Sequence, residues 1–185
     1  MKRGGRPQYA RTLAAVDPDD ETPQRNELNR LIMDLATSLS AADGSDLQIV
    51  HAWHLHAESM LRQSALTKIS TREINQLARE ERKRKKAALD RLLDNYLFID
   101  RRRQTHLIKG EAREIIPDLA RRDRVEFVVM GTVTRTDVQG LFIGNTAEAI
   151  LNQLECSVLA VKPPGFESPV RLDGAEERAP ALEMS

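Results

Sequence analysis

The sequence contains a single cysteine, Cys156, among its 185 residues, so no disulfide can form within the chain. Such sparse cysteine use is typical of proteins kept in a reducing compartment, and we expect a cytoplasmic location. No window approaches 18 consecutive apolar residues, and residues 1–17 lack the apolar stretch of a signal peptide. We therefore expect a soluble protein without a membrane span.

The chain also lacks an excess of either charge, because 28 Lys and Arg residues balance 28 Asp and Glu residues. Without a global field, binding of nucleic acid or an anionic membrane would need a local patch. The most basic run is REERKRKK at 79–86, and its own acids together with Asp90 dilute its field. This pattern indicates a solvated helix face, with a patch for an anionic partner as the alternative. We expect no nucleic-acid partner.

Glycine and proline are absent from residues 55 to 109, which favours helix through most of that stretch. Ser70 and Glu73 have the spacing of a capping box. The apolar residues that follow are spaced as on a helix, with a gap at 79–86, and predict a helix over 71–97. At about 1.5 Å per residue it would span roughly 40 Å, so we expect part of it to protrude or to cover a partner.

Short apolar runs alternate with amphipathic helical patterns along the rest of the chain. The predicted strands are residues 12–16, 47–53, 105–108, 125–130 and 157–161. The predicted helices include residues 23–41, a segment around 112–120, and 146–155. This alternation predicts an α/β fold, a five-stranded parallel sheet sandwiched by helices. The domain is assigned to 11–163, between a loose basic arm at 1–10 and a disordered tail at 164–185.

Two helices carry local signals of their own. Pro117 conflicts with a regular helix interior, so the sequence predicts either a kink there or a late start of that helix. Asn145 precedes the last predicted helix with Glu148 three residues later, which predicts an N-cap at Asn145.

The segment GTVTRTDVQGLFIGNTAE at 131–148 leads from an apolar strand into a helix. Ligands of parallel α/β sheets bind beyond the carboxyl ends of the strands, which is where this loop, Asp17 and His51 are expected. Glycines and a helix N-terminus are suited to phosphate. However, the loop has neither the Gly-Lys-Ser/Thr of a Walker loop nor a G-x-G-x-x-G pattern. On pattern alone it is equally a plain turn.

Several phrases taken together resemble the universal stress protein family. They are the early strand ending in Asp17, V-M-G-x-x-x-R-T at 129–136, G-N-T-A-E at 144–148 and C-S-V-L-A-V-K-P at 156–163. The resemblance covers residues 11–163 and is closest to the second half of the tandem-domain E-type members. It implies a Rossmann-like fold and an adenine-nucleotide pocket between the first two strands and the loop.

Carried over by this resemblance, Asp17 would lie near the sugar or base, and the backbone of Ala52 would face adenine. The loop positions implied to contact a ligand are Met130, Gly131, Thr134, Arg135, Gly144, Asn145 and Thr146. Thr134 stands where nucleotide-binding members have their second glycine, and its Cβ limits close approach. Asp137 adds a charge that would repel phosphates, which Arg135 could offset. The nucleotide-binding motif is thus only partly present, and ATP and AMP are both candidate ligands of a degenerate pocket.

Other reactive residues form weaker patterns. His54 and His56 of HAWHLH would share a face if the strand continued, but no carboxylate pair or cysteine lies at a convincing spacing. We predict no metal site. Cys156 precedes an apolar strand with no base beside it in the sequence, which favours a small core residue over a nucleophile.

No Ser–His–Asp order or pair of acids in a defined pocket indicates catalysis. We interpret the chain as a non-catalytic stress-response module that binds and signals as a dimer. The resemblance implies pairing through the last strand, which consists of Ser157, Val158, Leu159, Ala160 and Val161. The alternatives are a competent ATP- or AMP-binding protein with slow ATPase activity or phosphotransfer, and a pocket for an apolar or lipid-like ligand.

Overall fold

The computed structural model describes residues 9–18, 23–55, 70–101, 104–132 and 143–163. Five strands form one parallel sheet in the order β3-β2-β1-β4-β5. They are β1 (Arg11–Ala15), β2 (Asp46–Trp53), β3 (Thr105–Lys109), β4 (Phe127–Gly131) and β5 (Ser157–Val161). The predicted five-stranded parallel sheet is confirmed, and each strand begins and ends within two residues of its predicted bounds. The predicted tail and most of the predicted arm lie outside the described residues.

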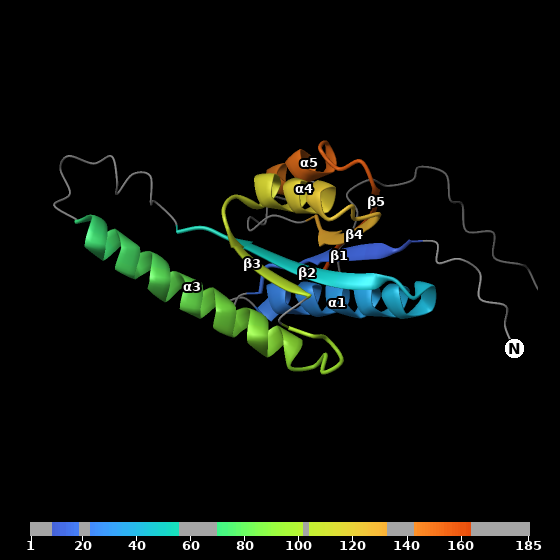
Figure 1. Ribbon diagram of the computed structural model, residues 1–185, viewed down its shortest axis with the longest axis horizontal. Coiled ribbons are helices and arrows are strands. Elements are labelled where there is room, and N and C mark those ends of the chain that lie inside the picture. The colour runs from blue at the N-terminus through green and yellow to red at the C-terminus, as the bar shows by residue number, and fades with distance from the viewer. Residues whose placement is uncertain (1–8, 19–22, 56–69, 102–103, 133–142, 164–185) are drawn as a thin grey trace, which may run out of the picture.

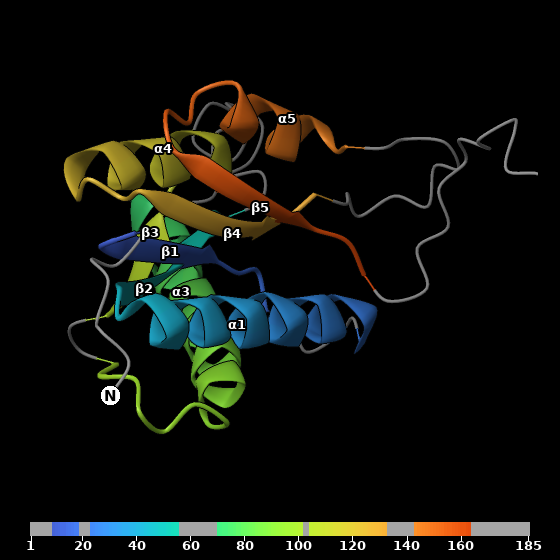
Figure 2. The same ribbon diagram turned by 90° about the vertical axis from the view of Figure 1, so that its right-hand side faces the viewer.

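Helices cover both faces of the sheet (Figures 1 and 2). One face carries α1 (Pro23–Asp43) and α3 (Thr71–Leu93), and the other carries α4 (Ala112–Arg122) and α5 (Asn145–Leu151). Neighbouring residues of β2 divide between the two cores: Ile49 packs with the α1–α3 core and Val50 with the α4–α5 core. Burial on both faces explains why the strands are short unbroken apolar runs.

None of the helices in the described segments combines the length and the apolar character needed to cross a bilayer.

The end of α1 is set by Gly44, which follows directly after Asp43. Gly44 has a φ of 69°, and the Ser45 N–H donates to the Ser40 carbonyl at 3.0 Å. This bond closes a Schellman-type turn, in which glycine adopts the left-handed conformation at no steric cost.

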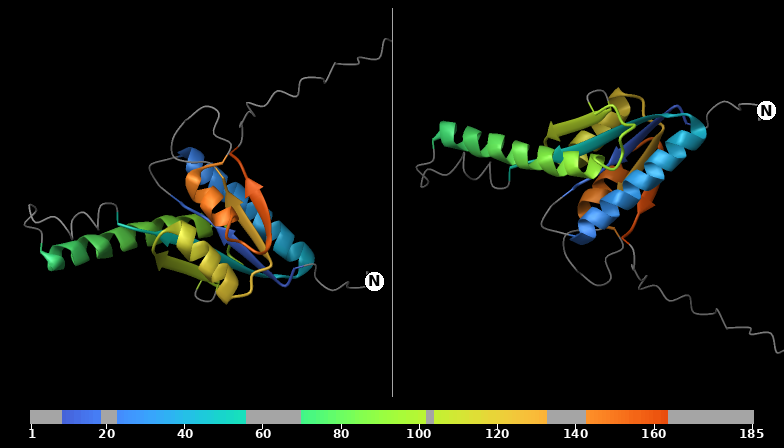
Figure 3. Two further views of the ribbon diagram at one scale, coloured as in Figure 1. Left: turned by 90° about the horizontal axis from the view of Figure 1, so that it is seen from above. Right: turned by 90° about the horizontal axis from the view of Figure 1, so that it is seen from below.

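Helix α3 begins with the predicted capping box. The Glu73 N–H donates to Ser70 Oγ at 3.2 Å, and the Ser70 N–H donates to the Glu73 carboxylate at 2.7 Å. The helix ends at Leu93 rather than at residue 97. Tyr96 lies in the turn that follows, and its hydroxyl donates to the Asp34 carboxylate of α1 at 2.6 Å. The first part of α3 extends beyond the sheet, as expected from its length (Figures 1 and 3).

Pro117 lies inside α4, which starts at Ala112 and continues to Arg122, so the predicted late start is wrong. Proline has no N–H for the Arg113 carbonyl four residues earlier. The Gln153 side-chain amide donates to that carbonyl instead, at 3.0 Å. A side chain from the turn after α5 thus supplies the hydrogen bond that Pro117 removes.

Helix α5 differs at both ends from its prediction. Its N-cap is Gly144, with extended backbone and no side-chain cap, so the predicted cap at Asn145 is wrong. The helix ends at Leu151 instead of residue 155. The Gln153 and Leu154 N–H groups both donate to the Ile150 carbonyl, at 3.0 and 3.1 Å, and turn the chain toward β5.

Replacing Gln153 with Ala should lower the free energy of unfolding by roughly 0.5–1 kcal/mol, because the Arg113 carbonyl loses its donor. Urea unfolding followed by circular dichroism measures the change. In a Pro117→Ala background the new N–H can serve Arg113, so Gln153→Ala should cost less there. Equal costs in both backgrounds would show that the two residues do not compensate each other.

Candidate functional site

Asp17 follows β1 at the carboxyl edge of the sheet, beside the point where strand order reverses between β1 and β4. Its N–H donates to Asn29 Oδ1 of α1 at 2.9 Å, which fixes the backbone. Its Oδ2 lies 3.5 Å from Arg25 Nη1, and the side chain is 48% exposed. The carboxylate therefore stands at the rim, open to solvent on one side and facing a cation on the other.

His51, in β2, is fully buried behind this carboxylate. Its Nδ1 lies 3.1 Å from the Val16 carbonyl, so Nδ1 carries the proton and donates to that oxygen. The same nitrogen lies 3.8 Å from Asp17 Oδ1. Nε2 is buried and has no hydrogen-bond partner among the residues that the structure describes. His51 is thus held in one neutral tautomer between the end of β1 and the α1–α3 core.

The surroundings of His51 oppose its protonation. Burial lowers its pKa, the Asp17 carboxylate works against that shift, and the Lys85 and Arg25 cations add to the lowering. Lys85 comes from the 79–86 run, which was predicted to be a solvated face. That prediction is wrong for Lys85, which is buried, with its Nζ 4.0 Å from Glu81 Oε1.

The histidine pattern does not gather a metal site in the described segments, where no group of three His, Cys, Asp or Glu residues could hold an ion. His54 Nδ1 lies 3.7 Å from the Glu111 carboxylate. His56 lies outside the described residues.

On the loop side, Gly131 ends β4 directly beneath α1. A Cβ at this position would lie 2.9 Å from Leu28 Cδ2. Close packing of α1 on β4 is therefore a reason for this glycine that needs no ligand. Met130, one residue earlier, is buried in the opposite core with α4 and α5.

The two ends of the loop are brought together. The Gly144 N–H donates to the Thr132 carbonyl at 2.9 Å, and the Thr132 N–H donates to the Val161 carbonyl of β5 at 3.1 Å. Asn145 and Thr146 are exposed at the start of α5. Thr134, Arg135 and Asp137 lie outside the described residues.

Ala52 is half-buried near the end of β2, where it pairs with Ile108 of β3. It follows His51 and so points to the opposite face of the sheet. The structure brings Asp17 and His51 together and sets Gly131 next to β1, whereas Ala52 lies on the β3 side.

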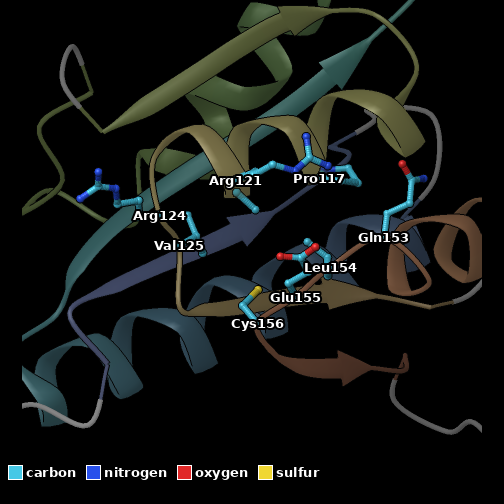
Figure 4. Close-up of a pocket in the computed structure, with 9 residues that line it drawn as sticks. Pro117, Arg121, Arg124, Val125, Gln153, Leu154, Glu155 and Cys156 are labelled. Atoms are coloured by element: carbon cyan, nitrogen blue, oxygen red, sulfur yellow. The ribbon is translucent and has the colours of Figure 1, made fainter.

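A surface hollow lies elsewhere, at the amino ends of β4 and β5 (Figure 4). Its lining includes Pro117, Arg121, Arg124, Gln153 and Cys156. Burial raises the pKa of the Cys156 thiol, which disfavours the reactive thiolate. The hollow is at the end of the sheet opposite to Asp17.

Three residues of this site were missed in the sequence: Arg25, Asn29 and Lys85. Arg25 and Asn29 are four residues apart on α1 and so share a face of the helix. The sequence does not indicate that this face packs near Asp17. Lys85 had a signal. It lies four residues before Leu89 and seven before Leu92, on the stripe that α3 buries.

A model of the universal stress protein family matches residues 8–162. The chain belongs to the universal stress protein family. It is 30% identical over 172 residues to universal stress protein E of Escherichia coli K12, covering 92% of this chain and 52% of that protein. The Haemophilus influenzae homologue is 28% identical over 153 residues, covering 83% of this chain and 48% of the relative. This family member thus spans about half the length of these curated relatives.

Solved structures have a similar fold. A protein of unknown function from Pseudomonas aeruginosa PAO1 has a TM-score of 0.65 and 28% identity, covering 88% of this chain and 50% of that one. A universal stress protein from Lactobacillus plantarum has a TM-score of 0.62 at 15% identity, covering 83% of this chain and 97% of that one. The second likeness shows the fold alone, and it confirms the predicted Rossmann-like architecture.

Because the folded state keeps His51 neutral while the unfolded chain takes up a proton near pH 6.5, this stress protein should lose stability as pH falls below about 6.5. One such group contributes a slope of up to about 1.4 kcal/mol per pH unit. His51→Asn, which keeps a donor toward Val16, should flatten that part of the profile. Urea unfolding between pH 7.5 and 5 measures it.

His106→Gln is the matched control, because burial lowers the pKa of that half-buried histidine too. If only the His106 variant flattens the profile, the assignment to His51 is wrong.

Proposed function

We propose that this universal stress protein domain is a non-catalytic, cytoplasmic binding and signalling module of the stress response, with a degenerate pocket that takes adenine nucleotides weakly. The observation that carries the proposal is the position of Asp17 at the strand-order reversal, with Arg25 at one carboxylate oxygen and His51 at the other. A sugar hydroxyl that binds Asp17 competes with groups already facing it. The cost of displacing them supports weak rather than tight binding.

The loop supports the same conclusion. Gly131 has a packing reason of its own, since Leu28 occupies the space a side chain would need. In the sequence, Thr134 stands where nucleotide-binding members have a glycine, and Asp137 adds a negative charge to the loop segment. The chain also lacks the Gly-Lys-Ser/Thr that holds transferring phosphates, which supports a binding role over an enzymatic one.

The alternative of an apolar or lipid-like ligand receives less support. It was motivated by the gapped apolar stripe on α3, and the second part of that stripe, with Leu89, Leu92 and Leu93, packs in the core with α1 and the sheet. The titration described below tests the alternative of a competent ATP-binding protein.

Calorimetric titration with ATP, ADP and AMP, with and without Mg²⁺, tests the pocket after mass spectrometry has checked for co-purified ligand. We expect a Kd of roughly 0.1–1 mM, corresponding to about 4–5.5 kcal/mol. Asp17→Ala and Gly144→Val should abolish binding, and Arg121→Ala, at the opposite end of the sheet, should leave it unchanged. Micromolar binding or turnover would favour the competent ATP-binding alternative. If none of the three nucleotides binds and lipid co-purifies with the protein, the apolar-ligand alternative is favoured.

The same module is proposed to dimerise through β5. Sheet order makes β5 an edge strand, and no strand in the described parts of the chain pairs with its outer side. Val158 and Leu159 are half-buried and Ala160 is exposed. An apolar unpaired edge invites association, so antiparallel pairing of two copies is a physically sensible way to cover it.

Introducing a charge on this edge by Ala160→Glu should convert the dimer to a monomer, as measured by light scattering. Ala160 is exposed, so the variant should still fold. Leu77→Glu is the matched control, because Leu77 is 42% exposed on α3. If Leu77→Glu yields monomers while Ala160→Glu stays dimeric, α3 forms the interface instead.

A further inference from the structure

Four cations form a line on the exposed face of α3, and we call them the basic stripe. Arg79 lies near its middle, and Arg72 precedes Arg79 by seven residues, or nearly two turns. Arg82 and Lys83 follow Arg79 by three and four residues, so the four side chains share one face. All four residues are exposed. At about 1.5 Å per residue, the basic stripe runs roughly 16 Å along α3, starting in the part that extends beyond the sheet (Figures 1 and 3).

Two acids of α3 are engaged outside the basic stripe. Glu73 closes the capping box, where hydrogen bonds from the Ser70 N–H and hydroxyl lower the pKa of its carboxyl group. The Glu81 side chain is 15% exposed, and its carboxylate lies 2.9 Å from Arg84 Nη2 and 4.0 Å from Lys85 Nζ. The negative charge of Glu81 is therefore directed to two cations that are not part of the stripe.

The remaining acids leave most of the stripe's charge uncompensated. Asp90 pairs with Lys86, which follows the stripe. Glu80 is exposed beside the stripe, and its carboxylate accepts a hydrogen bond from the Gln76 side-chain amide at 3.0 Å. No residue that the structure describes forms an ion pair or hydrogen bond with the stripe's own side chains. The sequence mixes acids and bases at 79–86, whereas the folded helix separates them and gives one face a net positive charge.

The surroundings of the stripe argue against three kinds of anionic partner. Single-stranded nucleic acids stack on aromatic side chains, and α3 contains none. Membrane-bound helices insert apolar residues, but the exposed large apolar residue of α3, Leu77, is five positions after Arg72 and so lies on another face. Duplex nucleic acid is gathered by a field that spans many phosphates, and this chain has no net charge.

A protein segment rich in Asp and Glu suits the stripe better. Three of its four cations are arginines, whose planar guanidinium groups bind carboxylates through pairs of parallel N–H bonds. The stripe is a narrow line, and an extended chain at about 3.3 Å per residue would cover its length with roughly five residues. A short run of carboxylates therefore matches it in both charge and length.

We propose that the basic stripe of α3 is a docking surface for an acidic segment of a partner protein. Exposed ion pairs each contribute little, so the contact is weak, reversible and sensitive to salt. The inference goes beyond the proposed nucleotide pocket and does not depend on it, since the stripe lies on α3 and the calorimetric titration tests the pocket separately.

Fluorescence anisotropy with a labelled peptide of alternating Glu and Ser tests this surface, and a peptide with Gln in place of Glu is the neutral control. We expect the full chain to bind the Glu peptide and not the Gln peptide. Binding should be at least about tenfold weaker at roughly 150 mM salt than at roughly 20 mM. The double variant Arg79→Gln/Lys83→Gln should bind at least about threefold more weakly than the wild type at low salt.

The matched control is Arg84→Gln/Arg91→Gln. It removes the same charge from the same helix, but from two positions seven residues apart that share a different face. Its affinity for the Glu peptide should stay within about twofold of the wild type. An equal loss in both double variants would mean that only the net charge matters, which overturns the proposal.

Other results also overturn it and identify a different occupant. A short DNA duplex, or vesicles of phosphatidylcholine and phosphatidylserine, could bind more tightly than the Glu peptide and depend equally on Arg79 and Lys83. The stripe would then be a surface for phosphates. Failure of the wild type to bind the Glu peptide at low salt overturns the proposal as well. If binding then appears once the five acids of residues 164–185 are changed to their amides, the occupant is this chain's own acidic segment.

Discussion

The structure depends on one constraint, the burial of a parallel sheet on both of its faces. Residues such as Leu13 and Val129 are fully excluded from solvent, and α1, α3, α4 and α5 provide the cover. A sheet enclosed in this way leaves polar side chains room mainly at its edges. Because all five strands run the same way, the end of each strand adds its groups to one common edge, which is where Asp17 and Gly131 lie.

Behind that edge the core contains buried polar side chains. His51 and Lys85 are buried, and so is Asn29, whose side chain accepts the Asp17 N–H. Buried polar groups destabilise a fold unless they are paired, so their presence points to a local task. Here Asn29 and His51 hold the end of β1, through the Asp17 N–H and the Val16 carbonyl, and Lys85 adds a positive charge near His51. The site is therefore a property of four elements, β1, β2, α1 and α3, rather than of the glycine-containing loop alone.

Regular elements could be predicted well because their signals are local. The capping box of Ser70 and Glu73 and the glycine that ends α1 need only neighbouring residues to act. The errors have the opposite origin. Pro117 is accommodated in α4 by Gln153, which lies 36 positions along the chain, and Lys85 is buried because α3 packs on β2. No local pattern contains such distant partners.

For this stress protein the sequence by itself determined the α/β class, the number and bounds of the strands, and the family. It also located Asp17 at a strand end, since apolar runs and their terminating residues are read without tertiary information. The tertiary structure decided what Asp17 faces. Arg25 of α1 and His51 of β2 come from separate elements, and only the packing of α1 on the sheet brings both of them to one carboxylate, while Lys85 of α3 adds its charge near His51.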